Sequence, residues 1–151
     1  MDVSVDTDGL TEVLDRMREL DEVLQLQIQG DGLLEAARVV ATAARANAPV
    51  RTGALQSTIR AVRQTGFVNE QRHKDIEAQV RAGGREAPYA VLVELGTVHT
   101  AAQPFLEPAA ISTGSAQLSA ASEAMRRSFT RAIQRLESAN SPSAVRRAAR
   151  G

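Results

Sequence analysis

Hydrophobic residues recur at helical spacing near both ends of the chain. At the N-terminal end they step by three and four positions, which predicts a first helix along Leu10, Val13, Met17, Leu20 and Leu24. The stripe stops at Gly30, and Asp31 is suited to cap a second helix. Asn47-Ala48-Pro49 ends that helix, because proline disfavours helical geometry in the residue before it. A second stripe from Leu118 to Glu137 predicts a long C-terminal helix.

Between these helices the pattern becomes that of strands. Residues 57–64 contain several β-branched side chains, and residues 76–82 alternate strictly between apolar and polar. We expect the two runs to pair as an antiparallel hairpin. The polar loop between them, residues 65–75, is longer than the loop of a tight hairpin. Before the first strand, the residues VRTGAL predict a turn in which Gly53 takes a positive φ angle.

The segment from Tyr89 to Leu95 fits two structures. Pro88 and Gly96 suit the two ends of a short helix, whereas alternation of apolar residues suits a strand; we favour the helix. Residues 104–110 predict a turn or short helix, which Ser112-Thr113-Gly114 separates from the C-terminal helix. The sequence thus predicts an α+β fold with N-terminal helices, a small antiparallel sheet or hairpin and a long C-terminal helix. We expect one domain over residues 1–138 and a flexible basic tail over residues 139–151.

Composition narrows the possible functions. The 151 residues include no cysteine, which excludes disulfide frameworks, zinc knuckles and thiol nucleophiles. The formal net charge of +0 is unevenly distributed, because residues 1–30 carry eight acids and two arginines and the remainder carries the compensating excess of bases. Such polarity favours contacts between subunits over a free nucleic-acid surface. No stretch approaches the ~20 apolar residues that cross a bilayer. The acidic N-terminus is unlike a signal peptide, so we expect a cytosolic protein.

Candidate catalytic residues are few. His73 and His99 fall in separate predicted loops, and neither has a second ligand at helical spacing, so a metal site would require the loops to converge. The chain contains neither a G-x-S-x-G elbow nor a phosphate-binding glycine loop. Glu94 and Glu107 could form an acid and base pair, but glutamates beside apolar segments more commonly lie on a solvated edge or pair with arginine. We expect no enzyme, no metal and no cofactor.

Arginines in the C-terminal helix give an alternative function. Arg127, Arg131 and Arg135 follow i, i+4 spacing and form a basic row. The row could bind nucleic acid, as in a small helical nucleic-acid-binding or regulatory protein, although no aromatic residues are interleaved to stack on bases. It could equally contact the acidic first helix of another subunit through side chains such as Asp15, Glu19 and Asp21.

Three motifs are more specific. Residues 48–55 read AP-x-x-TG-x-L, residues 89–97 read YA-x-x-x-E-x-GT, and residues 104–109 read PFL-x-PA. In this order and at these separations they resemble the tail-completion family of long-tailed bacteriophages, also described as neck or head-to-tail joining proteins. The resemblance covers residues 33–137.

The resemblance implies a structural protein of the virion. It implies a subunit of a hexameric ring in the neck, with a tail-terminator or tail-tube protein and a head-side connector protein as partners. Double-stranded DNA would pass through the lumen without sequence readout, and assembly would take place in the host cytoplasm. Phe105 and Leu106, between two prolines, would fill either the subunit's own core or a neighbour's pocket. The motif residues to which an assembly role is assigned are Pro49, Thr52, Gly53, Leu55, Tyr89, Glu94, Gly96, Thr97, Pro104, Phe105, Leu106 and Pro108.

Overall fold

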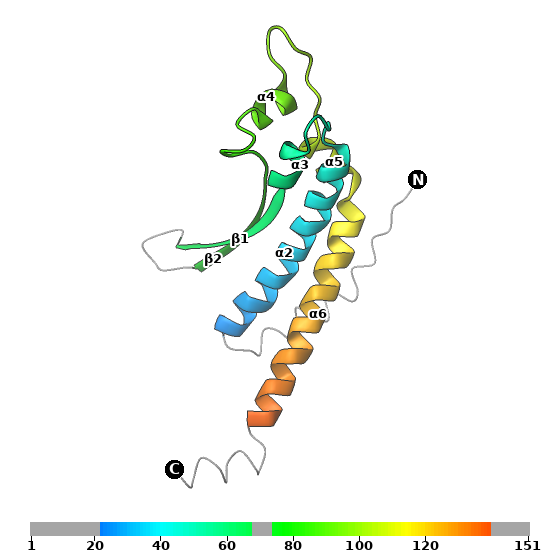
Figure 1. Cartoon of the computed structure of the whole chain (residues 1–151). Helices are drawn as coiled ribbons and strands as arrows, with labels where there is room; N and C mark the ends of the chain where they lie inside the picture. Colours follow the sequence, from blue (N-terminus) through cyan, green and yellow to red (C-terminus); the bar gives the residue numbers. More distant parts are fainter. Residues whose placement is uncertain (1–21, 68–73, 140–151) are drawn as a thin grey trace.

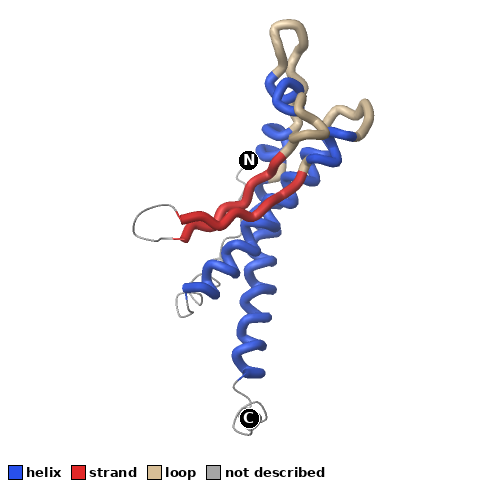
Figure 2. Tube along the Cα trace, turned by 60° about the vertical axis from the view of Figure 1, so that its left-hand side comes forward, coloured by secondary structure: helices blue, strands red, loops and turns tan. Residues whose placement is uncertain are grey.

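Two long antiparallel helices form the frame of the molecule. The structure is a computed structural model that describes residues 22–67 and 74–139. Helix α2 spans Glu22–Asn47 and helix α6 spans Gly114–Ala139, and they lie side by side in both views (Figures 1 and 2). The predicted C-terminal helix is therefore confirmed, with an earlier start than Leu118. The part of the predicted first helix from Leu10 to Leu20, and the tail beyond residue 139, lie outside the described residues.

Three short helices gather at the end where α2 finishes and α6 begins (Figure 1). They are α3 (Ala54–Thr58), α4 (Ala90–Leu95) and α5 (Leu106–Ser112). The helical interpretation of the segment after Tyr89 is confirmed, and Gly96 is the C-cap of α4 with φ 74°. Pro88 precedes the N-cap residue Tyr89 and so lies outside the first turn. A break at Thr113 separates α5 from α6, as predicted.

The predicted hairpin is also confirmed. Strand β1 (Arg60–Phe67) pairs antiparallel with β2 (Lys74–Arg81), with Ala61 opposite Val80. Ala61 and Val80 pack against the main core, so this face of the hairpin lies on the helical frame. The hairpin crosses α2, and the ends of the two strands farthest from α3 extend away from the helices (Figure 2). The resulting architecture is α+β.

The predicted bounds of the strands were wrong. Ser57 and Thr58 belong to α3, where their hydroxyls donate to the carbonyls of Ala54 (2.8 Å) and Leu55 (2.7 Å). This short helix turns Leu55 into the core, which outweighs the strand preference of β-branched residues. The expected loop was too long, because pairing continues to Phe67 and resumes at Lys74; residues 68–73 lie outside the described part of the chain.

The predicted helix break at Gly30 was wrong as well. Helix α2 continues through Gly30, Asp31 and Gly32, so Asp31 is not a cap. Gly32 has a packing role instead, because a Cβ there would lie 2.6 Å from two side-chain carbons of Met125 and 3.1 Å from the carbonyl oxygen of Ala121. A Cβ at Gly30 would meet only the end of the Arg63 side chain. Tertiary contacts therefore outweigh the loss of helix stability, about 1 kcal/mol for each glycine relative to alanine. The predicted end of the helix at Asn47 is confirmed.

The core is made of small side chains around one large ring. Phe105 is 0% exposed, and Ile59, Ala41 and Ala44 are equally enclosed. These residues come from α5's N-cap, the start of the hairpin and α2, so the core lies at the end of the frame that carries the three motifs. A second cluster around Ile28 holds the other part of α2 against α6. The three motifs thus lie in the best-packed part of the described chain.

Candidate assembly site

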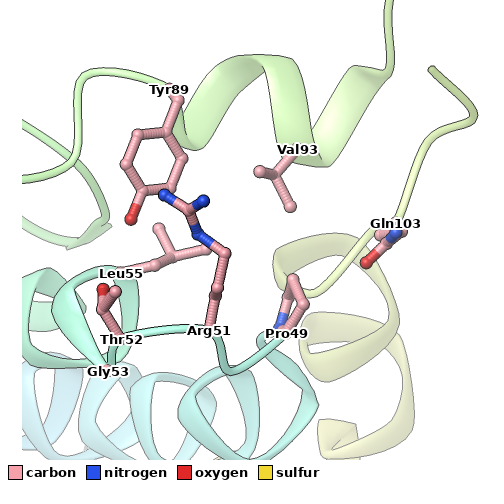
Figure 3. Close-up of a pocket in the computed structure, with 8 residues that line it drawn as sticks. All are labelled: Pro49, Arg51, Thr52, Gly53, Leu55, Tyr89, Val93 and Gln103. Carbon is pink, nitrogen blue, oxygen red and sulfur yellow. The ribbon is translucent and has the colours of Figure 1, made fainter.

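The first two motifs meet at a cleft of about 320 Å³. One wall is the linker after α2 together with the start of α3, and the other is α4 (Figure 3). Arg51 extends from the linker towards α4, and Tyr89 and Val93 extend towards it from the opposite wall (Figure 3). The lining residues are Pro49, Arg51, Thr52, Gly53, Leu55, Tyr89, Val93 and Gln103. The residues of the two walls are therefore neighbours here, although they lie 34 or more positions apart in the sequence.

The linker turns sharply because of Gly53. Its φ is 77°, in the left-handed region that favours glycine, as predicted from the sequence. Thr52 Oγ1 accepts a hydrogen bond from the N–H of Ala54 at 3.4 Å, and the carbonyl of Gly53 accepts one from Ser57 at 3.1 Å. These contacts start α3 directly after the turn and place Leu55 in the core. The TG pair of the first motif therefore shapes one wall of the cleft.

Glu94 joins the second motif to the third. Its Oε2 accepts hydrogen bonds from the N–H groups of Phe105 (2.8 Å) and Leu106 (3.0 Å), and its Oε1 accepts one from Glu107 (3.0 Å). The first N–H groups of a helix have no partner within the helix. The next residue, Pro108, has no N–H at all. One carboxylate and one proline thus account for every free donor at the start of α5.

The environment of Glu94 favours its ionised form. Burial raises the pKa of the Glu94 carboxyl, but the hydrogen bonds from the N–H groups of Phe105, Glu107 and Leu106 together lower it by more, so the pKa lies below its ordinary value of 4.5. The charge also lies at the N-terminal end of α5, where a helix favours an anion. Glu94 is accordingly a half-buried structural carboxylate bound to backbone, and Glu107 is exposed. Within the described residues, no arginine forms an ion pair with Glu94.

The third motif fills the subunit's own core. Phe105 is fully enclosed, and Leu106 is half-buried against the same cluster. Pro104 and Pro108 are exposed on either side of them. Of the two possibilities left open by the sequence, the structure thus selects the intrasubunit core for Phe105.

Gly96 and Thr97 shape the loop between α4 and α5. Gly96 has φ 74°, and a Cβ there would lie 2.7 Å from the backbone N of Ala102. Thr97 and Thr100 exchange two backbone hydrogen bonds, 2.8 and 3.3 Å long, which fold the loop into a tight turn. The N–H of Gln103 donates to Val93 O at 2.8 Å and closes the loop onto α4. Glu94, Gly96 and Thr97 of the second motif therefore each have a local structural role.

Large apolar side chains are exposed at this same end of the molecule. Leu95 is 74% exposed and Val98 is 97% exposed. They stand on α4 and on the loop after it, at the extreme end of the structure in both views (Figures 1 and 2). We call this set the apolar end; its members are Val50, Tyr89, Val91, Leu92, Leu95 and Val98. Where exposed apolar side chains form one contiguous patch, the patch commonly marks a surface that contacts another protein.

The arginine row lies on α6, away from the apolar end. Arg127 pairs with Glu123 of the same helix at 2.7 Å. Arg131 donates to the carbonyl of Arg127 and to Ser128 Oγ, each at 3.2 Å. Arg135 lines a small pocket between α2 and α6. Two of the three arginines thus have intrahelical partners. The proposed acidic partners Asp15, Glu19 and Asp21 lie outside the described residues.

A polar network that sequence reasoning missed ties three elements together. Asp31 of α2 accepts a hydrogen bond from Ser128 Oγ of α6 and pairs with Arg63 of β1 at 3.4 Å. Ser128 is buried, and its hydroxyl also accepts the bond from Arg131. In the sequence, Asp31 stands between two glycines, a pattern that predicts a helix boundary. Its role in the network could be recognised only once α6 and β1 were known to approach α2 at this point.

The described residues contain no group of three or more histidine, cysteine, aspartate or glutamate side chains that could hold a metal ion. His99 lies in the loop after α4, and His73 lies outside the described residues. None of the helices within residues 22–67 and 74–139 is long and apolar enough to span a membrane.

Comparison with known proteins gives one match. A family model described as "Bacteriophage HK97-gp10, putative tail-component" matches residues 11–96, more than half of the chain. The matched range includes both walls of the cleft and Glu94, and it ends at Gly96, before the third motif. No curated protein and no solved structure matches the chain.

Proposed function

Because this chain belongs to the HK97-gp10-like family of bacteriophage tail components, we propose that it completes the head-facing end of the tail and takes part in joining the tail to the head. In this role it is a structural virion protein without catalytic activity. It forms a hexameric ring in the neck, and double-stranded DNA passes through the lumen without sequence readout. The family match to a tail component is the observation that carries the proposal.

The arrangement of the motifs supports an assembly role. The first two motifs build a cleft, and Glu94 and Phe105 fix the third motif beneath it. These contacts hold α4 and the loop after it in a fixed position at one end of the two-helix frame. A joining protein needs such a surface, because it must present the same shape to each incoming partner.

The apolar end is the surface we assign to a neighbouring protein ring. Leu95 and Val98 are more than two-thirds exposed, which costs free energy in water unless another surface covers them. The partners we propose are the tail-terminator or tail-tube protein on one side and the head-side connector protein on the other.

The uneven charge of the chain supports a ring. In a ring each copy uses one surface to contact a different surface of the next copy. The net negative charge of residues 1–30 and the arginines of α6 give one chain two segments of opposite sign. We propose Asp15, Glu19 and Asp21 as the acidic side and Arg127, Arg131 and Arg135 as the basic side of that contact.

A phage that lacks this gene tests the proposal. We expect host cells to accumulate DNA-filled heads and separate tails, seen by electron microscopy of the lysate. Adding the purified protein to the separated tails and heads should restore joined, infectious particles. Intact infectious particles from the deletion phage would overturn the joining role, and unfinished tubes of irregular length would place the protein at an earlier step of tail assembly.

A further inference from the structure

Both outer edges of the β1–β2 hairpin are open. Each strand has eight residues, and the two pair with each other along their whole length. Among the described residues, no backbone hydrogen bond joins either strand to another segment. Since alternate residues of a strand point their N–H and C=O groups to opposite sides, each outer edge presents an unpaired row of donors and acceptors. Such a row is a template for pairing with another strand.

The two faces of the hairpin differ sharply. Ala61 and Val80 lie on the core side, and Arg63 also reaches inward, to Asp31. The opposite face is polar, and Arg81 there donates to the side-chain oxygens of Gln64 (3.0 Å) and Gln79 (3.1 Å). The side chains of this polar face that the structure describes are Arg60, Val62, Gln64, Glu77, Gln79 and Arg81.

From these open edges, and resting on the ring proposed above, we propose that the hairpins of adjacent copies join edge to edge. The outer edge of β2 in one copy pairs antiparallel with the outer edge of β1 in the next. Repeated around the ring, this contact closes all hairpins into one antiparallel barrel. The helices then lie outside the barrel and the polar face lines the lumen.

The occupant of each edge is a second copy of this chain because the two edges complement each other. β1 and β2 have equal length and opposite direction, so a β2 edge beside the next β1 edge continues the antiparallel alternation without interruption. The edges are different surfaces, as a ring contact requires. Only closure removes every open edge of a sheet.

Charge on the polar face supports the same contact. Within one hairpin Arg60 lies directly opposite Arg81, and like charges in that position are destabilising. Glu77 lies on the same face of β2. Pairing between copies with the register shifted by four residues places Arg60 opposite this carboxylate of the next copy, whereas full overlap places it opposite Arg81 again.

Disulfide cross-linking tests the contact cleanly because the natural chain has no cysteine. A Val62→Cys variant is mixed in turn with Glu77→Cys, Gln79→Cys and Arg81→Cys variants, which step along β2 two residues at a time and so scan the register. Each mixture is oxidised as concentrated purified protein and within assembled tails. Thr42→Cys, at an exposed position on α2, replaces Val62→Cys in the matched control.

We expect one of the three mixtures to convert monomer to covalent dimer, with little dimer in the Thr42→Cys mixtures. Tails that join heads normally but show no cross-link in any mixture would overturn the edge pairing and leave the joining role intact. Equal cross-linking of Thr42→Cys and Val62→Cys would also overturn it, because random collision would then explain the dimers. If tails form and join without this protein, the joining role itself is wrong.

Discussion

At the residue scale, the Glu94 carboxylate explains why the second and third motifs occur together. It binds three consecutive backbone N–H groups at the start of α5, and the fourth position is Pro108, which needs no partner. Two of the three residues that donate these bonds, Phe105 and Leu106, also pack in the core. A change at Glu94 is therefore expected to act on stability through the placement of Phe105.

Replacing Glu94 with glutamine should destabilise the fold by about 1–3 kcal/mol, because one carboxylate oxygen becomes an amide that cannot accept a hydrogen bond. Urea unfolding followed by circular dichroism measures the change. Glu86→Gln, at an exposed position before α4, is the matched control and should have little effect. Equal stability of the two variants would show that the backbone bonds to Glu94 contribute nothing.

The same carboxylate gives stability a dependence on pH. Its pKa in the folded chain is lower than its ordinary value of 4.5, which applies when the chain is unfolded. The stabilisation from ionised Glu94 is therefore fully present above pH 4.5 and is lost as pH falls through the lower, folded pKa. We expect the difference in unfolding free energy between the natural chain and Glu94→Gln to shrink in that acidic range. A difference that stays constant as the pH falls would contradict this assignment.

Gly96→Ala should destabilise the protein by about 1–3 kcal/mol, because alanine is strained at positive φ and its Cβ would meet the backbone N of Ala102 at 2.7 Å. Thermal unfolding measures the effect. Gly114→Ala is the control, since a Cβ there meets nothing within 4 Å and α6 gains a better helix former. A neutral Gly96→Ala variant would mean that the loop after α4 rearranges freely.

Turn glycines were the most predictable residues of the site. Gly53 and Gly96 were identified from the sequence because their neighbours indicate a turn and a helix end, and both have positive φ. The partners of Glu94 were not predictable in this way. Its bonds depend on the path of residues 97–104, which brings Phe105 back to α4, and no local pattern encodes that path.

At the element scale, the Asp31 network decides how α2, β1 and α6 fit together. Local sequence favoured a helix break at Gly30, and the error has a physical cause. Arg63 and Met125 occupy the space that side chains at Gly30 and Gly32 would fill, and Asp31 binds Ser128 across the helix pair. The existence of the long helices and the hairpin could be predicted from periodicity; the continuity of α2 required knowledge of its neighbours.

Ser128→Ala should therefore cost about 1–2 kcal/mol, because it removes a buried hydrogen bond to the charged Asp31. Chemical unfolding measures the loss. Ser122→Ala lies on the same helix and removes only a bond to the carbonyl of Ser119, so it is the matched control. If both substitutions have the same effect, the network adds nothing to the packing of α2 against α6.

At the scale of the whole molecule, substitutions at the apolar end should impair assembly without changing the stability of the subunit. Leu95→Asp and Val98→Asp should change the unfolding free energy by no more than about 0.5 kcal/mol relative to the natural chain, because both side chains are exposed. The same variants should strongly reduce the joining of separated tails to heads in vitro. Leu136→Asp, exposed near the other end of α6, should reduce neither. Normal joining by Val98→Asp would exclude the loop from the contact.

The tight turn between Thr97 and Thr100 has a consequence for the rate of joining. Its two backbone bonds, the close fit at Gly96 and the bond from Gln103 to α4 hold Val98 in position within the isolated subunit. A partner that covers Val98 then has little conformational entropy to remove from the loop. We expect the finished tail to meet the head with its contact surface already ordered, so that the encounter of the two particles, and not refolding of this loop, limits the rate.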